Sequence, residues 1–343
     1  PSYWYGKLEF NTEAGPSGEQ IPPVESMRKM MPEQDLWPIS DSWNIRLNKA
    51  FFPAARKALF SRYGKPENLN EYSMKSQVLQ YEASRAMFEA YAGNKYKSSG
   101  IIYWMYNSAW PTMYWQLYDY FLAPNGAFYG IKKACENLHI QYSYDDHSVR
   151  VVNGLYRDFS GLKASAKLYD MKMNEIHSEE VPVAVKADES VKVMFLEKPR
   201  PGSGITFLKL ILNDDSGREL SSNFYWLSSK GDENADFTAL NRLPEVELSC
   251  SVSPVLKENV RYRAVIEIEY PSDFLAFSVN PKIIRRESGD LVLPVFWEDN
   301  YFALLPKEKR SVKVEFSDQD LGGEIPVLAI DGWNIRKAEQ ELK

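Results

Sequence analysis

Hydrophobic and polar positions follow two different patterns along the chain, and the change falls near residue 137. Up to about Glu136, short strand-like runs alternate with stretches that have helical periodicity. After Asn137, short segments of alternating hydrophobicity recur with turn residues between them, and no convincing amphipathic helix interrupts them. The first pattern is typical of an α/β domain, and the second is typical of β-sandwiches.

The first part predicts strands separated by helices. An aromatic run at residues 4–10 predicts a strand that ends in a polar loop at 11–18. The continuous apolar run at 100–106 predicts a second strand, buried on both faces as in a parallel sheet. Asn70 is expected to cap the longest helix. The helices are expected at 22–30, which opens on two prolines, at 71–91 and at 127–136.

The second part predicts two immunoglobulin-like β-sandwiches, divided by a polar stretch at residues 228–236. The first sandwich should contain strands near 139–144, 149–153, 163–169, 192–195, 206–212 and 222–226. The second should contain strands near 245–252, 262–270, 275–279, 291–294, 301–304, 311–316 and 327–330. The domains expected from these patterns are 1–136, 137–231 and 232–343.

The first part does not read as a complete domain. Two buried strands have too few neighbours, because a two-stranded sheet is at best marginally stable. We therefore expect residues 1–136 to be the C-terminal part of a (β/α)8 TIM barrel whose earlier strands lie upstream of Pro1. In such barrels the catalytic side chains lie where strands end and βα-loops begin.

Composition removes several classes of function. The net charge is −6 and no long basic run occurs, which argues against a general nucleic-acid binder. Three His and two Cys are too few and too scattered for a zinc site, so no metal is expected. No apolar stretch approaches the ~18 residues that indicate a membrane span. The chain begins at Pro1 without the pattern of a secretory signal.

Glu13 is the candidate nucleophile. It follows the first expected strand, in the loop Asn11-Thr12-Glu13-Ala14-Gly15, beside small residues. A retaining glycosidase needs a carboxylate there, close to a second carboxyl group that acts as acid and then as base. The alternative is a loop carboxylate that binds nearby backbone N–H groups, which the motif alone favours.

Trp104, Asn107 and Trp110 are the candidate sugar-binding residues, in the loop after the second expected strand. Aromatic residues make up 14% of the chain, and an aromatic face packs well on the C–H face of a sugar. The Asn107 amide is suited to bind a sugar hydroxyl. The alternative is ordinary packing of these aromatic side chains within and between domains.

At this point the sequence resembles a known family. Residues 10–17, 100–111 and 125–139 look like the last part of the catalytic domain of glycoside hydrolase family 2, most of all its exo-β-D-glucosaminidase branch, with β-mannosidases as near relatives. Residues 223–227, 236–244, 294–301 and 332–334 are similar to the C-terminal immunoglobulin-like module of that branch.

The resemblance implies roles for individual residues. Glu13 matches the catalytic nucleophile. Asn107 and Trp110 match the Asn and Trp of the family's Leu-Asn-Asp-x-Trp-Pro loop, and Trp104 matches the Trp that lines the sugar pocket. Ser108 stands where that pattern has Asp, which leans away from β-mannosidase.

The family's general acid/base, the Glu of an Asn-Glu pair that precedes the nucleophile, has no match here. Asn-Glu occurs only at 70–71 and 174–175, after Glu13. We expect the chain to be the C-terminal portion of a longer retaining glycosidase and to turn over essentially nothing alone, since acid–base assistance is worth ~10²–10⁴-fold. Its expected partners are an oligosaccharide substrate and the missing N-terminal part, without a cofactor. The resemblance also implies a secreted or periplasmic enzyme.

Two alternatives stay open. One is a β-mannosidase or another exo-acting family 2 enzyme. The other belongs to a different class: a non-catalytic carbohydrate-binding or structural protein built from immunoglobulin-like modules. This second reading predicts that Glu13 is buried or paired, away from any cleft.

Overall fold

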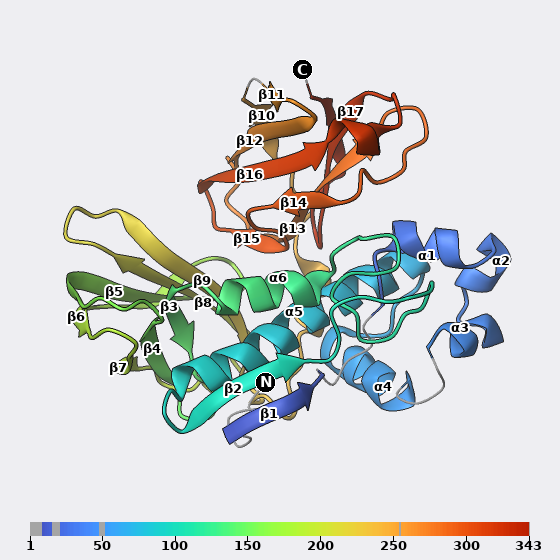
Figure 1. The fold of residues 1–343 in the computed structure, drawn as a ribbon. Helices are drawn as coiled ribbons and strands as arrows, with labels where there is room; N and C mark the ends of the chain where they lie inside the picture. The colour runs from blue at the N-terminus through green and yellow to red at the C-terminus, as the bar shows by residue number, and fades with distance from the viewer. Residues whose placement is uncertain (1–8, 16–20, 48–51, 254, 343) are drawn as a thin grey trace.

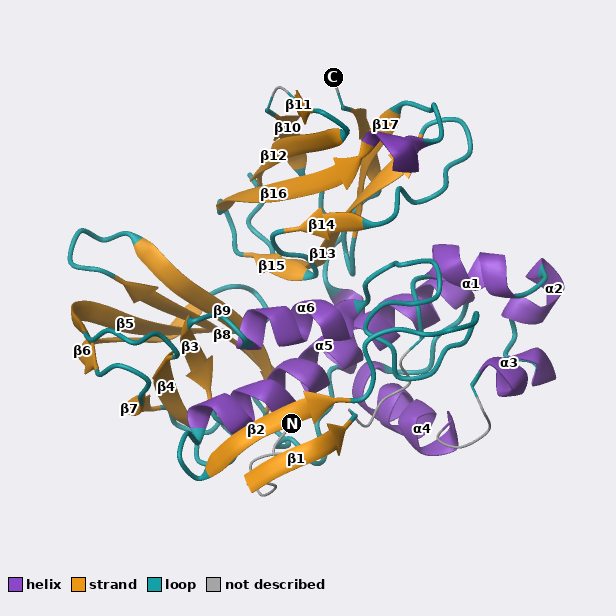
Figure 2. Cartoon of the chain, in the orientation of Figure 1, coloured by secondary structure: helices purple, strands orange, loops and turns teal. Residues whose placement is uncertain are grey.

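The computed structural model describes residues 9–15, 21–47, 52–253 and 255–342. Its α-helices lie in one region, which also holds two strands, and the rest of the chain is built of strands and loops with short 3₁₀ turns (Figures 1 and 2). The strands after residue 137 form two separate β-regions, which both lie against the helical region (Figure 1).

The helical region is organised by two parallel strands. Strand β1 (Glu9–Ala14) pairs with β2 (Ser98–Tyr103), and helix α5 (Leu69–Gly93) contacts β2. Phe10 lies over Gly100, where an ideal Cβ would come within 2.9 Å of the Phe10 ring. The shorter helices are α1 (Val24–Met30), α2 (Glu33–Leu36), α3 (Asp41–Arg46) and α4 (Phe52–Tyr63), of which only α1 was expected.

Helices α5 and α6 (Gly126–Ala134) touch through their backbones. An ideal Cβ on Gly126 would lie 2.1 Å from the Gln77 carbonyl oxygen, and one on Gly130 would lie 2.4 Å from the Tyr81 carbonyl oxygen. No side chain fits in that space, so both positions require glycine. The backbone N–H of Gly126 donates to Gln77 Oε1 at 2.7 Å, which adds a polar contact to the packing.

Several expectations for this region were wrong. Asn68, not Asn70, caps α5: its Oδ1 accepts from the Glu71 N–H at 3.0 Å, and Asn70 lies inside the first turn. Residues 4–8 of the first expected strand lie outside the described residues, and β1 continues to Ala14, so Glu13 belongs to the strand rather than to a loop. Strand β2 ends at Tyr103 and is not buried on both faces, since only Ser98 of its six residues is fully buried and Ile102 is half exposed.

The first sandwich consists of two antiparallel sheets, as its alternating pattern indicated. One sheet has the order β3 (Leu138–Tyr142), β4 (Ser148–Asn153), β7 (Ser190–Phe195). The other has the order β6 (Glu175–Val185), β5 (Phe159–Tyr169), β8 (Ile205–Asn213), β9 (Glu219–Ser228). Alternate residues in the middle of β5, Leu162, Ala164 and Ala166, are buried between the sheets. Strand β6 was missed, because its first half is exposed and polar.

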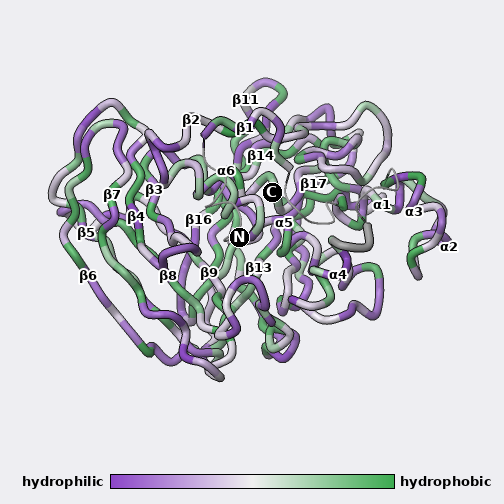
Figure 3. The backbone as a smooth tube through the Cα atoms, turned by 90° about the horizontal axis from the view of Figure 1, so that it is seen from below, coloured by the Kyte–Doolittle hydropathy of each residue, from purple (hydrophilic) through white to green (hydrophobic). Residues whose placement is uncertain are grey.

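The second sandwich has the same two-sheet plan. One sheet contains β10 (Ser249–Val252), β11 (Leu256–Glu258), β12 (Arg261–Glu269), β16 (Lys309–Ser317) and β14 (Val295–Trp297). The other contains β15 (Phe302–Leu304), β13 (Ala276–Arg285), β17 (Pro326–Asp331) and β18 (Ala338–Glu341). The change between hydrophilic and hydrophobic positions along such strands is visible in Figure 3. The strand expected at 291–294 was wrong: Leu291 only bridges Ile284, and the strand begins at Val295.

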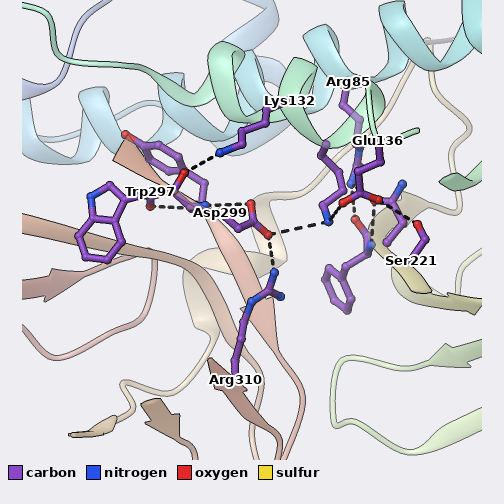
Figure 4. A network of polar contacts seen from close by, with 12 residues as sticks. Arg85, Lys132, Glu136, Ser221, Trp297, Asp299 and Arg310 are labelled. Atoms are coloured by element: carbon purple, nitrogen blue, oxygen red, sulfur yellow. Dashed lines mark hydrogen bonds and ion pairs between the residues drawn. The ribbon is translucent and has the colours of Figure 1, made fainter. Parts of the chain in front are cut away.

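Helix α6 joins the two sandwiches through polar contacts (Figure 4). Lys132 Nζ donates to the Trp297 carbonyl oxygen of the second sandwich at 2.6 Å. Glu136, just beyond the end of α6, accepts from Ser221 Oγ of the first sandwich at 2.9 Å. Lys133 pairs with Glu136 at 2.6 Å, which fixes the orientation of the carboxylate. Side chains at this end of the helix therefore contact both β-regions.

A second set of polar side chains is buried between α5 and the first sandwich. We define the buried junction cluster as Arg85, Glu89, Glu136, His139, Asn223 and Tyr225. Arg85 Nη1 donates to Asn223 Oδ1 at 2.8 Å, and its guanidinium lies 4.0 Å from the centre of the Tyr225 ring. Glu89 Oε1 accepts from Asn223 Nδ2 at 2.7 Å and from the Tyr225 hydroxyl at 2.8 Å. These contacts offset part of the cost of burying the two charges, although Arg85 Nε and Nη2 and Glu89 Oε2 have no hydrogen-bond partner among the described residues.

His139 lies between two carboxylates of this cluster. Its Nε2 is 3.0 Å from Glu89 Oε1, and its Nδ1 is 3.2 Å from Glu136 Oε2. Ionised carboxylates only accept hydrogen bonds, so the imidazolium, which donates from both nitrogens, fits this arrangement. Burial opposes the charge, but the hydrogen bonds to Glu136 and Glu89 outweigh it and raise the pKa of His139 above its usual value.

Candidate active site

The carboxyl ends of β1 and β2 lie side by side. The register places Ala14 opposite Tyr103, and the Trp104 N–H donates to the Ala14 carbonyl oxygen at 2.8 Å. Glu13 therefore lies at the same edge of the sheet as the loop that begins at Trp104. In parallel sheets this edge is where ligands and catalytic residues are most often found.

Glu13 is exposed to solvent on β1. Its backbone N–H donates to Asn11 Oδ1 at 3.1 Å, and its carboxylate makes no hydrogen bond or ion pair with any described residue. The neighbouring Ala14 is buried. An ideal Cβ on Gly15 would lie 3.3 Å from the Trp104 carbonyl oxygen, so the chain beyond Glu13 passes close to the second loop. The carboxylate is thus available to a ligand.

The loop after β2 folds back on itself. The peptide bond between Trp104 and Met105 is cis, and the Met105 N–H donates to the Trp115 carbonyl oxygen at 3.2 Å. The Tyr118 N–H donates to the Tyr106 carbonyl oxygen at 2.9 Å, which closes the far end of the loop. Backbone hydrogen bonds between the two arms thus hold the loop in place.

The candidate sugar-binding residues lie on the exposed side of this loop. Trp104 and Trp110 keep 44% and 45% of their surfaces accessible, which is unusual for tryptophan and leaves part of each ring open to a ligand. Asn107 is exposed, and its amide bonds to no described residue. The structure brings Trp104 next to the strand that carries Glu13, whereas Asn107 and Trp110 lie further along the loop.

Arg46 supports the loop and was missed in the sequence. Its guanidinium lies 5.7 Å from the centre of the Trp110 ring, and Nη1 donates to the Pro111 carbonyl oxygen at 2.8 Å. Nη2 donates to the Met30 carbonyl oxygen at 2.7 Å. Arg46 thus ties α1 and α3 to the loop and stacks against Trp110. Its partners are distant in sequence, so no local pattern indicated this role.

Two absences concern only the part of the chain that the structure describes. Within it, no group of three or more His, Cys, Asp or Glu side chains is arranged to hold a metal ion. None of its helices is long and apolar enough to cross a bilayer.

Comparison with known proteins gives a consistent answer. The family model described as the exo-beta-D-glucosaminidase Ig-fold domain matches residues 223–335. An exo-beta-D-glucosaminidase of Amycolatopsis orientalis is 34% identical over 97% of this chain, and one of Streptomyces avermitilis is 33% identical over all of it. In sequence, the chain is homologous to exo-β-D-glucosaminidases of glycoside hydrolase family 2. It spans 36% and 41% of the lengths of these two relatives.

Solved structures extend this homology to the fold. The crystal structure of the Amycolatopsis orientalis exo-chitosanase superimposes with a TM-score of 0.90 at 31% identity, over 99% of this chain and 44% of that one. A β-D-mannosidase from Dictyoglomus thermophilum gives a TM-score of 0.72 at 22% identity, over 97% of this chain and 40% of that one, which shows a shared fold. The resemblance to the exo-β-D-glucosaminidase branch is therefore confirmed by sequence and by structure.

Proposed function

We propose that this chain is a portion of a retaining exo-β-D-glucosaminidase that releases terminal glucosamine from chitosan-type oligosaccharides. The observation that carries the proposal is the exposed carboxylate of Glu13, which bonds to no described residue and lies at the carboxyl edge of two parallel strands, beside the exposed Trp104. The homologous enzymes support the substrate class, because the two relatives from Amycolatopsis orientalis and Streptomyces avermitilis carry this activity in their names.

We further propose that residues 1–136 are the C-terminal part of a TIM barrel, followed by immunoglobulin-like domains at 137–231 and 232–343. The parallel pairing of β1 with β2 and the packing of α5 on β2 support the barrel assignment. Phe10 and Ile102 on these strands are each about half exposed, at 53% and 52%. In the proposed enzyme, strands from a region outside these 343 residues would cover them and would supply the general acid/base.

The proposed reaction is a double displacement with retention of configuration. A carboxylate oxygen of Glu13 attacks the anomeric carbon, and the bond from that carbon to the leaving oxygen breaks as the acid donates its proton to that oxygen. Water then attacks the anomeric carbon of the glycosyl ester. It gives a proton to the residue that acted as the acid in the first step and now acts as the base. The sugar leaves, and Glu13 returns to the carboxylate form.

The loop residues take the binding roles in this proposal. The open ring surfaces of Trp104 and Trp110 are suited to stack on the C–H face of the terminal sugar, and the free Asn107 amide is suited to bind a hydroxyl. Arg46 would act as a positioning residue, because it holds Trp110 and the Pro111 carbonyl oxygen. We include export from the cytoplasm in the same proposal, since the enzyme would encounter a polymeric glycan outside the cell.

Substitution of Glu13 tests the proposal in the intact protein that contains this chain. Glu13→Gln keeps the size and shape of the side chain but removes the nucleophile, so we expect kcat on an aryl β-glucosaminide to fall by at least about 10³-fold. Glu9→Gln is the matched control, because Glu9 is an exposed carboxylate on the same strand and should change kcat little.

Two results would count against the proposal. Undiminished turnover in the folded Glu13→Gln variant would exclude Glu13 as the nucleophile. Turnover of an aryl β-mannoside in place of the glucosaminide would favour the β-mannosidase alternative. That alternative is supported by similarity to the mannosylglycoprotein endo-beta-mannosidase of Lilium longiflorum, which is 24% identical.

A further inference from the structure

A cavity of about 510 Å³ opens beside the first sandwich, and none of its lining residues belongs to β1, β2 or the loop after β2. Its walls come from α5, the turn between β3 and β4, the loop between β7 and β8, and the segment that links β9 to the second sandwich. Its volume lies within the range of about 300–1,000 Å³ that is typical of small-molecule sites. We call it the linker cavity.

The floor of the linker cavity is aromatic. Tyr142, Tyr144, Trp226 and Phe237 line it, and each is less than 10% exposed. Their positions are fixed by neighbours: Trp226 Nε1 donates to the Tyr63 hydroxyl at 3.0 Å, and the Tyr142 and Tyr144 rings meet edge to face at 5.4 Å. Only small parts of these rings reach the cavity, and they give it an apolar floor that sugar C–H groups can contact.

Three carboxylates line the mouth of the cavity. Asp145 and Glu233 line it, are exposed, and make no ion pair with any described residue. Asp232 also lines it, with Oδ1 3.5 Å from Arg62. Arg62 in turn donates to both carboxylate oxygens of Glu82 at 2.9 Å, so the Glu82 charge at the inner wall is already neutralised. The unpaired acidic groups are therefore those nearest solvent.

Two basic groups line the mouth as well. Lys198 and Arg200 lie on the loop between β7 and β8 and are exposed. Burial and the nearby Lys198 lower the pKa of His147 below its usual value, so its ring adds no positive charge at neutral pH. The mouth therefore carries two carboxylates without an ion partner among the described residues, Asp145 and Glu233, and two cationic side chains, so acceptors for an ammonium group and donors for hydroxyl oxygens line the same opening. A cationic ligand with hydroxyl groups satisfies both sets of side chains.

We propose that the linker cavity is a second saccharide-binding site, which takes a short segment of a glucosamine-containing chain. The aromatic floor would contact the sugar C–H faces, Asp145 and Glu233 would bind the 2-ammonium groups, and Lys198 and Arg200 would donate to hydroxyl oxygens. This inference rests on the proposed function for its substrate class. Contact at two points would raise the affinity of long chains over short ones, because the second contact becomes intramolecular.

The test measures binding separately from turnover. In the intact protein carrying Glu13→Gln, calorimetric titration with a glucosamine tetramer should show one equivalent that D145N/E233Q weakens by about 10-fold. The control pair D215N/E267Q neutralises exposed carboxylates in the turn between β8 and β9 and on β12, and should leave that equivalent unchanged. The fully N-acetylated tetramer, which has no ammonium groups, should bind this equivalent more weakly than the free amine.

The outcomes separate this proposal from the one on which it rests. Equal tetramer affinity in D145N/E233Q and its parent, or equal affinity for the acetylated tetramer, would overturn the linker-cavity site. Failure of the unmodified protein to hydrolyse an aryl β-glucosaminide would overturn the proposed activity, while the loss of one bound equivalent in D145N/E233Q would still identify the cavity. With active enzyme, D145N/E233Q should raise KM for long oligomers and leave that for the aryl glucosaminide unchanged.

Discussion

The buried junction cluster and the carboxyl edge of β1 and β2 use polar and aromatic side chains in opposite ways. At the junction, Arg85 and Glu89 are almost fully excluded from solvent, and each bonds to side chains or backbone of the first sandwich. At the edge, Glu13 and Asn107 are exposed and bond through their side chains to no described residue. We infer that the junction stabilises the arrangement of domains and that the edge is left free for a ligand.

The largest effect on stability is expected from Arg85→Met at the junction. The substitution keeps much of the side-chain volume but removes the Arg85 donor from the Phe224 carbonyl oxygen and from Asn223 Oδ1, which keeps only the Phe224 N–H. A hydrogen bond to a charged group is typically worth about 1.5–3 kcal/mol and two are lost, so we expect a loss of about 3 kcal/mol in the free energy of unfolding by urea titration. Arg157→Met, at an exposed arginine that lies 4.7 Å over the Phe159 ring, should cost less than about 1 kcal/mol. Equal losses of unfolding free energy in Arg85→Met and Arg157→Met would contradict the stabilising role of the junction.

A smaller, pH-dependent effect is expected at His139. Because its pKa is raised in the folded state, the stability it contributes is fully present below the unfolded pKa of about 6.5 and is lost as pH rises through the folded pKa. The pKa of Glu136 is lowered to about 2, since hydrogen bonds to His139 and Lys133 outweigh its burial, so Glu136 adds no change in this range.

Melting temperatures from pH 5 to 9 check this prediction. His139→Gln should be clearly less stable than its parent at low pH, and the difference should shrink as pH rises. His177→Gln, at a histidine about half exposed on β6, should give a small difference that does not follow this trend. A gap between His139→Gln and its parent that is constant with pH would mean that His139 is not charged in the folded protein.

The smallest stability change is expected at the open edge, from Trp110→Ala. Trp110 is 45% exposed and its main contact is with Arg46, so we expect a loss of about 1 kcal/mol or less. In the intact protein, kcat/KM should nevertheless fall by about 10-fold or more, because a stacking surface for the sugar is lost. Tyr156→Ala, at a tyrosine that is 93% exposed, is the control and should change neither quantity. Unchanged kcat/KM for Trp110→Ala would remove the residue from the proposed site.

Much of the fold was predictable because the strands of the sandwiches have one buried face. The alternation along β5 and β12 is a direct consequence of that burial. Strand β6 was missed because an edge strand with exposed polar residues on both faces carries no such signal. The error in the helix cap could have been avoided from the sequence, because Asn68 is followed three residues later by Glu71, as in a capping box. In the structure, Glu71 Oε2 accepts from the Glu67 N–H at 2.7 Å.

The candidate site was predictable only in part. The apolar run of β2 indicated a strand buried on both faces, and the described residues leave Ile102 half exposed. Positions of Glu13 and Trp104 at strand ends followed from the pattern, although the structure ends β1 one residue after Glu13. Arg46 and the linker cavity depend on contacts between residues that are far apart in the chain, so single-sequence patterns carry no information about them.

The most direct test of the central claim is to trap the glycosyl ester on Glu13. The intact protein would be treated with an activated 2-deoxy-2-fluoro-glucoside, whose second step is slow, and digested with trypsin, which places Glu13 on the peptide of residues 8–28. We predict that tandem mass spectrometry finds one glycosyl group on Glu13, that Glu9→Gln retains it and that Glu13→Gln lacks it. A label on another carboxylate, with Glu13 unmodified, would contradict the account.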